Sequence, residues 1–177
     1  VIFMKNKLLY QITEFDCVPI CIINSLIYFY KREEIDVNIL KYIWNFSLDL
    51  DNDGTSKNSI KKIINFLNNN LSKTKFEIKE QNEVNLVNII KCFNNGVVIL
   101  RTYLEDGHYI LITNYNTKYI LAFDPYKLSK ESLNNYVKDS DKIYYNRKIN
   151  YKRFIDSSKK NFSLGPLKER FAIFVSM

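Results

Sequence analysis

The stretch Tyr10–Tyr30, YQITEFDCVPICIINSLIYFY, sets the architecture of this chain. Beyond Pro19 its apolar residues recur at helical spacing with almost no charge, which predicts a largely buried helix. Proline is tolerated in the first turn of a helix, so we expect the helix to begin at about Cys17 or Val18. Asp16 lies just upstream, where an acidic residue suits the positive end of a helix.

Cys17 is therefore expected at the positive end of a helix dipole, an arrangement that favours the nucleophilic thiolate. Gln11 precedes it by six residues, in a short irregular segment from which a side-chain amide reaches the same place. This is the layout of a cysteine nucleophile with an oxyanion donor. The alternative is an inert core residue, because free cysteines are among the most buried side chains.

The sequence contains one histidine, His108, at the start of a strand-like run that ends at Tyr115. Asp124 ends the next such run, and the three residues 116–118 between the runs are typical of a hairpin turn. Antiparallel strands joined by so short a loop place the start of the first strand beside the end of the second. We therefore expect His108 and Asp124 to be neighbours. The alternatives are a structural histidine and an aspartate that only starts a turn with Pro125.

Four short motifs carry a family resemblance: Gln11, Asp16-Cys17, Gly107-His108-Tyr109 and Asp124-Pro125. They resemble the signature elements of the C39 peptidases, papain-like cysteine proteases that cleave leader peptides after a double glycine. The resemblance runs from about residue 9 to about residue 126. It implies a papain-like fold and a catalytic triad. In that triad Cys17 is the nucleophile, His108 its base and Asp124 the orienting carboxylate, while Gln11 donates to the oxyanion.

Two features depart from the family pattern. The family usually has a glycine after the cysteine, where this chain has Val18-Pro19. Transporter-fused members continue into membrane helices, whereas this chain is more similar to the standalone C39-like proteins. The resemblance implies a cysteine peptidase acting on a peptide or protein substrate, such as a leader peptide. The alternatives are an acyltransferase or peptide ligase on the same fold, and a C39-like binding module without chemistry.

The rest of the pattern predicts an α+β fold, in which N-terminal helices pack on a mostly antiparallel sheet, because helices come first and most strands later. We expect a single domain over residues 1–177. The segment Ser129–Lys138 is left open as a helix or a loop. Further helices are expected at Val37–Phe46, Lys57–Asn70 (capped by Thr55 or Ser56) and Val84–Asn94. Further strands are expected at Lys75–Lys79, Val97–Tyr103, Lys142–Arg147 and Phe171–Met177.

Composition limits the class of protein. Hydrophobic residues make up 46% and aromatic residues 15% of the chain, which argues against disorder. The net charge of +7 is spread along the chain, which favours solvated faces over a nucleic-acid surface. No run of eighteen apolar residues exists, so we expect no membrane-spanning segment. Three cysteines and the lack of signal-peptide features predict a cytoplasmic protein. The oligomeric state is left open.

We expect no cofactor and no metal. The sequence has no paired cysteines or histidine cluster with zinc-ligand spacing. Asp49, Asp51, Asp53 and Gly54 resemble the opening of a calcium loop, but Ile60 stands where such a loop needs a bidentate glutamate. A polar loop before a capped helix is the better interpretation of this segment. Of the other cysteines, Cys21 and Cys92 are expected in the core.

Overall fold

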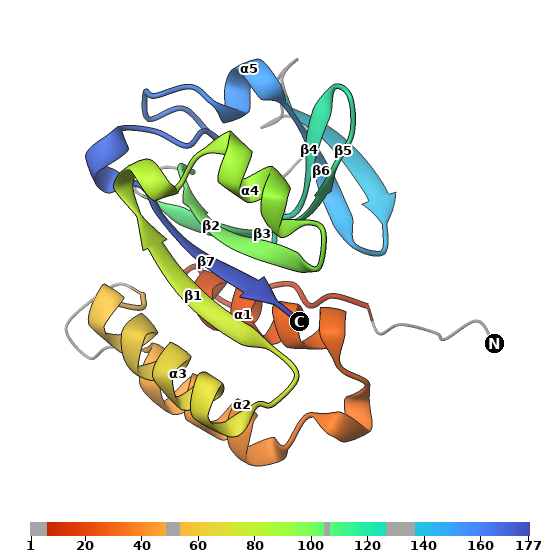
Figure 1. Ribbon diagram of the computed structural model, residues 1–177, viewed down its shortest axis with the longest axis vertical. Helices are drawn as coiled ribbons and strands as arrows, with labels where there is room; N and C mark the ends of the chain where they lie inside the picture. The colour runs from red at the N-terminus through yellow and green to blue at the C-terminus, as the bar shows by residue number, and fades with distance from the viewer. Residues whose placement is uncertain (1–6, 49–53, 105–106, 127–136) are drawn as a thin grey trace.

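The computed structural model describes residues 7–48, 54–104, 107–126 and 137–177, with only the backbone for residues 139–141 (Figure 1). Within these residues it contains five α-helices and one seven-stranded antiparallel sheet, so the predicted α+β class is confirmed. The strand order is β1-β7-β2-β3-β4-β6-β5. The helices are α1 (Cys17–Phe29), α2 (Val37–Ser47), α3 (Lys57–Asn70), α4 (Leu86–Cys92) and α5 (Tyr151–Phe154). The strands are β1 (Lys75–Glu80), β2 (Gly96–Thr102), β3 (His108–Tyr115), β4 (Tyr119–Phe123), β5 (Val137–Lys142), β6 (Tyr145–Asn150) and β7 (Phe171–Ser176).

Helix α1 begins at Cys17, as Pro19 in its first turn predicted. Every residue from Val18 to Leu26 is buried, because the helix packs against α2 on one side and against β2 and β3 on the other. This enclosure explains why the sequence of α1 is apolar all round rather than on one face. The helix therefore holds Cys17 at a fixed place over the sheet.

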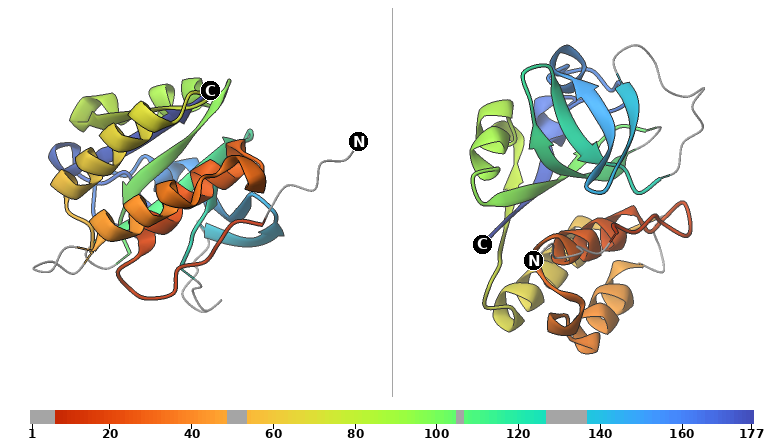
Figure 2. Two further views of the ribbon diagram at one scale, coloured as in Figure 1. Left: turned by 90° about the horizontal axis from the view of Figure 1, so that it is seen from below. Right: turned by 90° about the vertical axis from the view of Figure 1, so that its right-hand side faces the viewer.

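The sheet separates two hydrophobic cores. Helices α1, α2 and α3 cover one face, and α4 and α5 cover the other (Figures 1 and 2). Strand β2 contributes to both, since Val97 and Ile99 point into the first core while Val98 and Leu100 point into the second. Alternate residues of a strand point to opposite faces, so a strand buried on both faces is a continuous apolar run.

Several local predictions are confirmed. Ser56 caps α3, its hydroxyl accepting a hydrogen bond from Ser59 N at 3.2 Å. The hairpin β3-β4 forms as expected, and the Asn116 side chain accepts hydrogen bonds from Lys118 N and Tyr119 N in its turn. Helix α2 and strand β1 lie within about a residue of their predicted bounds.

Two predicted elements differ from the structure. The strand expected at Lys142–Arg147 straddles the turn between β5 and β6, in which Ile143 is exposed despite its apolar side chain. Helix α4 is shorter than expected because Asn85 caps it, accepting a hydrogen bond from Asn88 N. The C-terminal strand β7 forms where it was predicted and lies between β1 and β2. Most of the segment 129–138 and the three aspartates at 49, 51 and 53 lie outside the described residues.

Candidate active site

The start of β3 and the end of β4 bring His108 and Asp124 together, as the hairpin geometry predicted. Nε2 of His108 lies 2.7 Å from Oδ1 of Asp124, and both side chains are buried. Gly107 allows the chain to enter β3 at this point, since its φ is +126° and an added Cβ would lie 2.9 Å from a guanidinium nitrogen of Arg101. A side chain at residue 107 would strain the backbone that delivers His108.

The ring orientation corrects one sequence-based expectation. The tautomer argument places Nδ1 of the histidine against the carboxylate and Nε2 against the thiol. In the structure Nε2 bonds Asp124, so Nδ1 is the nitrogen left for Cys17. The sequence identifies the pair of residues, but the side-chain rotamer decides which ring nitrogen each partner meets.

Cys17 lies beside the His108 side chain and favours the charged form of its ring. Burial disfavours the charged imidazolium, but hydrogen bonds and charge from Asp124 and Cys17 outweigh burial and raise the pKa of His108 to about 9. The ring therefore holds its proton at neutral pH. A protonated imidazole beside a thiol at a helix N-terminus favours a thiolate–imidazolium ion pair.

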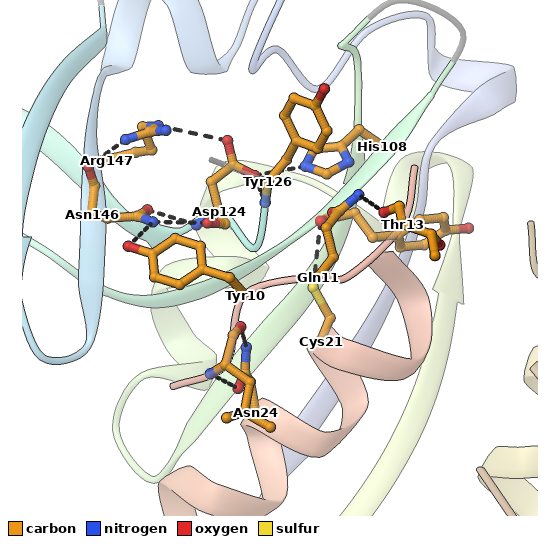
Figure 3. A network of polar contacts seen from close by, with 12 residues as sticks. Tyr10, Gln11, Thr13, Cys21, Asn24, His108, Asp124, Tyr126, Asn146 and Arg147 are labelled. Carbon is orange, nitrogen blue, oxygen red and sulfur yellow. Dashed lines mark hydrogen bonds and ion pairs between the residues drawn. The ribbon is translucent and has the colours of Figure 1, made fainter. Parts of the chain in front are cut away.

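Hydrogen bonds join the segment before α1 both to α1, which carries Cys17, and to the end of β4, which Asp124 follows. Gln11 N donates to Pro125 O at 3.0 Å, which ties the segment to the end of β4. The buried Asn24 of α1 bonds both main-chain groups of Leu9, at 2.7 Å and 2.9 Å. The carboxylate of Asp16 accepts from the main-chain nitrogens of residues 12 and 13 instead of capping α1. Gln11 is thereby held next to the Asp124-Pro125 turn (Figure 3).

The side-chain amide of Gln11 uses only part of its hydrogen-bonding capacity. Its Nε2 donates to Thr13 O at 2.7 Å, which leaves the second N–H of the amide for another acceptor. Its Oε1 is buried and has no hydrogen-bond partner in the described part of the chain. Gln11 therefore keeps unused hydrogen-bonding capacity beside the Asp124-Pro125 turn.

Two residues of β6 that sequence reasoning missed surround Asp124. The side chain of Asn146 accepts from Asp124 N at 2.7 Å and donates to Asp124 O at 2.8 Å. Arg147 Nε lies 3.6 Å from Asp124 Oδ2, so Asp124 sits between Arg147 and His108 (Figure 3). The available signal was two adjacent polar residues in a strand-like run, which is weak because exposed strands show it as well.

Tyr126 completes the surroundings of the pair. Its main-chain N donates to Asp124 Oδ1 at 2.9 Å, the same oxygen that bonds His108. Its ring meets the imidazole edge-on, with centroids 6.3 Å apart. The carboxylate is thus oriented from three sides by β3, β6 and the turn after β4.

The other two cysteines differ from Cys17. Cys21 is fully buried, its thiol donates to Tyr109 O at 3.4 Å, and burial raises its pKa well above the usual value. Cys92 is partly buried, and burial raises its pKa to about 11. Both remain protonated thiols at neutral pH. Of the three free cysteines, Cys17 is the one that meets the histidine.

Comparisons with protein-family models, with curated proteins and with solved structures found no match. The described residues contain no group of three or more His, Cys, Asp and Glu side chains able to hold a metal ion. No helix in the described ranges has the length and apolar character needed to cross a membrane. The functional interpretation therefore rests on the geometry around Cys17 and on the motif resemblance.

Proposed function

We propose that the protein is a C39-like cysteine peptidase that cleaves a peptide bond through Cys17, His108 and Asp124. The observation that carries the proposal is the buried pair of His108 and Asp124, with the partly buried Cys17 beside the imidazole at the N-terminus of α1. These three side chains stand in the order nucleophile, base and orienting group that covalent acyl transfer requires.

In the first step, the Cys17 thiolate attacks the carbonyl carbon of the scissile peptide bond. The imidazolium of His108 donates its proton to the leaving amine as the carbon–nitrogen bond breaks, which leaves a thioester on Cys17. In the second step, His108 takes a proton from water as the water attacks the thioester. The acid product leaves, and the thiolate–imidazolium pair is restored.

Asp124 stabilises the imidazolium and fixes the ring through its 2.7 Å contact with Nε2. The negative oxygen that develops in each step needs donors near Cys17. The first-turn main-chain N–H groups of α1 lack intrahelical partners, and the free N–H of Gln11 supplies a second donor. Losing one such donor typically costs about 3 kcal/mol of transition-state stabilisation.

The arrangement of layers supports a papain-like architecture, in which a buried helix carries the cysteine and an antiparallel sheet carries the histidine and the carboxylate. Apolar side chains of the segment before α1 are exposed beside the site: Leu9, Tyr10, Ile12 and Phe15. Exposed apolar side chains gathered at a site favour a peptide or protein over a small charged molecule as substrate. A leader peptide is one such substrate.

The test is the reactivity of Cys17, with the other cysteines as internal controls. We expect an iodoacetamide-type probe to alkylate Cys17 well ahead of Cys21 and Cys92 near neutral pH, because those two stay protonated. Mass spectrometry of tryptic peptides gives the three rates. Equal, slow rates would show a binding module without chemistry.

Substrate class is tested with a peptide library, including peptides with a double-glycine junction. Cleavage by the wild type and none by Cys17→Ala is expected. A trapped thioester offered amines separates hydrolysis from transfer, because transfer to the amine in preference to water would make the enzyme an acyltransferase. Cleavage that survives in purified Cys17→Ala would exclude Cys17 as the nucleophile.

A further inference from the structure

Asn146 and Arg147 are consecutive residues of β6, and both are almost completely buried, with 5% and 3% of their surfaces exposed. Burying an arginine is unfavourable unless a partner compensates its charge. The last residue pair between β4 and β6 joins Ala122 to Arg147. Beyond this pair, the main-chain N and O of Asp124 hydrogen-bond the side chain of Asn146. Strand β6 therefore contacts Asp124 through two different side chains.

The carboxylate of Asp124 divides its two oxygens between two cationic groups. Oδ1 bonds His108 at 2.7 Å, and Oδ2 lies 3.6 Å from Arg147 Nε. Oδ2 has no hydrogen-bond partner in the described residues, so its main interaction there is with the guanidinium charge. The guanidinium is anchored in turn, since its NH1 group donates to Asn146 O at 3.1 Å.

We propose that Arg147 is a positioning residue of this site: its buried guanidinium keeps Asp124 charged and aimed at His108, and it balances the charge of the thiolate form. In that form the charges alternate from Arg147 (positive) through Asp124 (negative) and His108 (positive) to Cys17 (negative). The proposal rests on the proposed peptidase mechanism and adds a residue to it.

Among the residues that the structure describes, His108 of β3 and Cys21 of α1 interact with Asp124, and Cys17 interacts with His108. Cys21 stays a neutral thiol, so Arg147 and His108 dominate the local charge. Removing a buried cation disfavours every nearby anion and favours every nearby cation. Loss of the guanidinium therefore raises the pH at which the thiolate forms and the pH at which the imidazolium loses its proton.

The experiment compares Arg147→Met with the wild type, with Arg147→Lys and with Arg170→Met. Arg170 is the matched control, because its guanidinium bonds main-chain oxygens of Val84 and Gly165 rather than any site residue. The chain has a single histidine, so one imidazole signal in an NMR titration reports His108 without ambiguity. The second readout is the rate of Cys17 alkylation against pH.

We expect Arg147→Met to move both the His108 titration and the Cys17 profile to higher pH by roughly one unit, the order of effect of a charge at this range. Arg147→Lys and Arg170→Met should leave both near their wild-type positions. A purely structural arginine would change the melting temperature but neither profile. Unshifted profiles in folded Arg147→Met would overturn the proposal.

Arg147→Gln repeats the test if Arg147→Met does not fold, because glutamine keeps a donor against Asp124 while removing the charge. Unfolding of both neutral variants beside folded Arg147→Lys would count against the proposal, since the charge would then serve the fold. Failure of the peptidase mechanism looks different: wild-type Cys17 would then be as slow as Cys21 and Cys92. The histidine titration would still report the effect of Arg147 in that case.

Discussion

Asp124→Asn is the sharpest test of the candidate triad. The substitution keeps the shape of the side chain but removes the anion that lies 2.7 Å from His108 Nε2 and 3.6 Å from Arg147 Nε. The pKa of His108 is raised from 6.5 to about 9, against the opposing effect of burial, by Asp124 and Cys17 together. This shift corresponds to about 3 kcal/mol of preference for the imidazolium. We expect the substitution to remove much of it.

Turnover should fall heavily, because the neutral amide neither stabilises the imidazolium nor fixes the tautomer. The comparable substitution in a serine protease costs about 10⁴-fold. The substitution should also lower the stability of the fold. Asp124 is fully buried against Arg147, and removing one partner of a buried ion pair typically destabilises by about 3–5 kcal/mol.

The double variant Asp124→Asn/Arg147→Met separates the two effects. It removes the guanidinium together with the carboxylate, so the free energy of unfolding should recover in part while turnover stays low. Urea unfolding and steady-state peptide cleavage provide the two measurements. Asp156→Asn, which removes a partly exposed carboxylate paired with Lys160, is the control for the loss of a charge away from the site. A stable Asp124→Asn with near-normal turnover would refute this reasoning and leave a Cys–His dyad.

Four further outcomes are expected. Cys17→Ala should abolish cleavage while changing the free energy of unfolding by only about 1–2 kcal/mol. His108→Ala should also abolish cleavage but should cost about 3–5 kcal/mol, because it removes one partner of the buried pair with Asp124, as calorimetry or urea unfolding would show. The pKa of His108 is higher in the folded protein than in the unfolded chain, so its contribution to stability is fully present below about pH 6.5 and is lost as the pH rises through 9. The free energies of unfolding at pH 6 and at pH 9.5 should therefore differ by about 3 kcal/mol. Equal stability at the two pH values would contradict the paired imidazolium. Asn146→Ala should reduce turnover as well as stability, whereas Asn68→Ala, which loses the same pair of main-chain bonds at Phe76 in a more exposed place, should leave turnover unchanged. Adding EDTA or calcium should leave activity and melting temperature unchanged, and calcium-dependent stabilisation would show that the aspartates near residue 50 bind an ion.

Local signals in the sequence were sufficient for the elements that carry the candidate residues. Proline in a first turn located the start of α1, a serine cap located α3, and a short polar turn located the β3-β4 hairpin. These signals work because they depend on the backbone conformation of a few adjacent residues. The hairpin alone predicts that the start of β3 lies beside the end of β4, where His108 and Asp124 stand.

The missed features depend on contacts between distant segments. The chain has only four glycines and three prolines, so many of its turns carry no marker, and aromatic residues run straight through the turn between β5 and β6. The strand predicted at Lys142–Arg147 straddles this turn. It gave no sign that Asn146 and Arg147 contact Asp124, because these contacts depend on the neighbouring strand. The insertion of β7 between β1 and β2 likewise reflects pairing between segments about seventy residues or more apart.

The position of His108 relative to Asp124 also depends on a β-bulge in β3, which a regular hairpin would not have. Near the turn Asn114 pairs with Leu121, but beyond Thr113 the register shifts, so that Ile112 pairs with Ala122. Directly paired residues share a face of a sheet, and so do residues two apart in one strand. Ile112 and Ala122 both point into the second core. Stepping along each strand in twos puts His108 and Asp124 on that same face.

Without the bulge at Thr113, Ala122 would pair with Thr113 itself, and Asp124 would fall on the opposite face from His108. Thr113 is buried, and its hydroxyl donates to Tyr144 O at 2.9 Å, in the turn that leads into β6. The extra residue is therefore held in place by the same segment that supplies Asn146 and Arg147. The hairpin brings the two strands together, but the bulge and its anchor in the β5-β6 turn decide that the imidazole and the carboxylate meet.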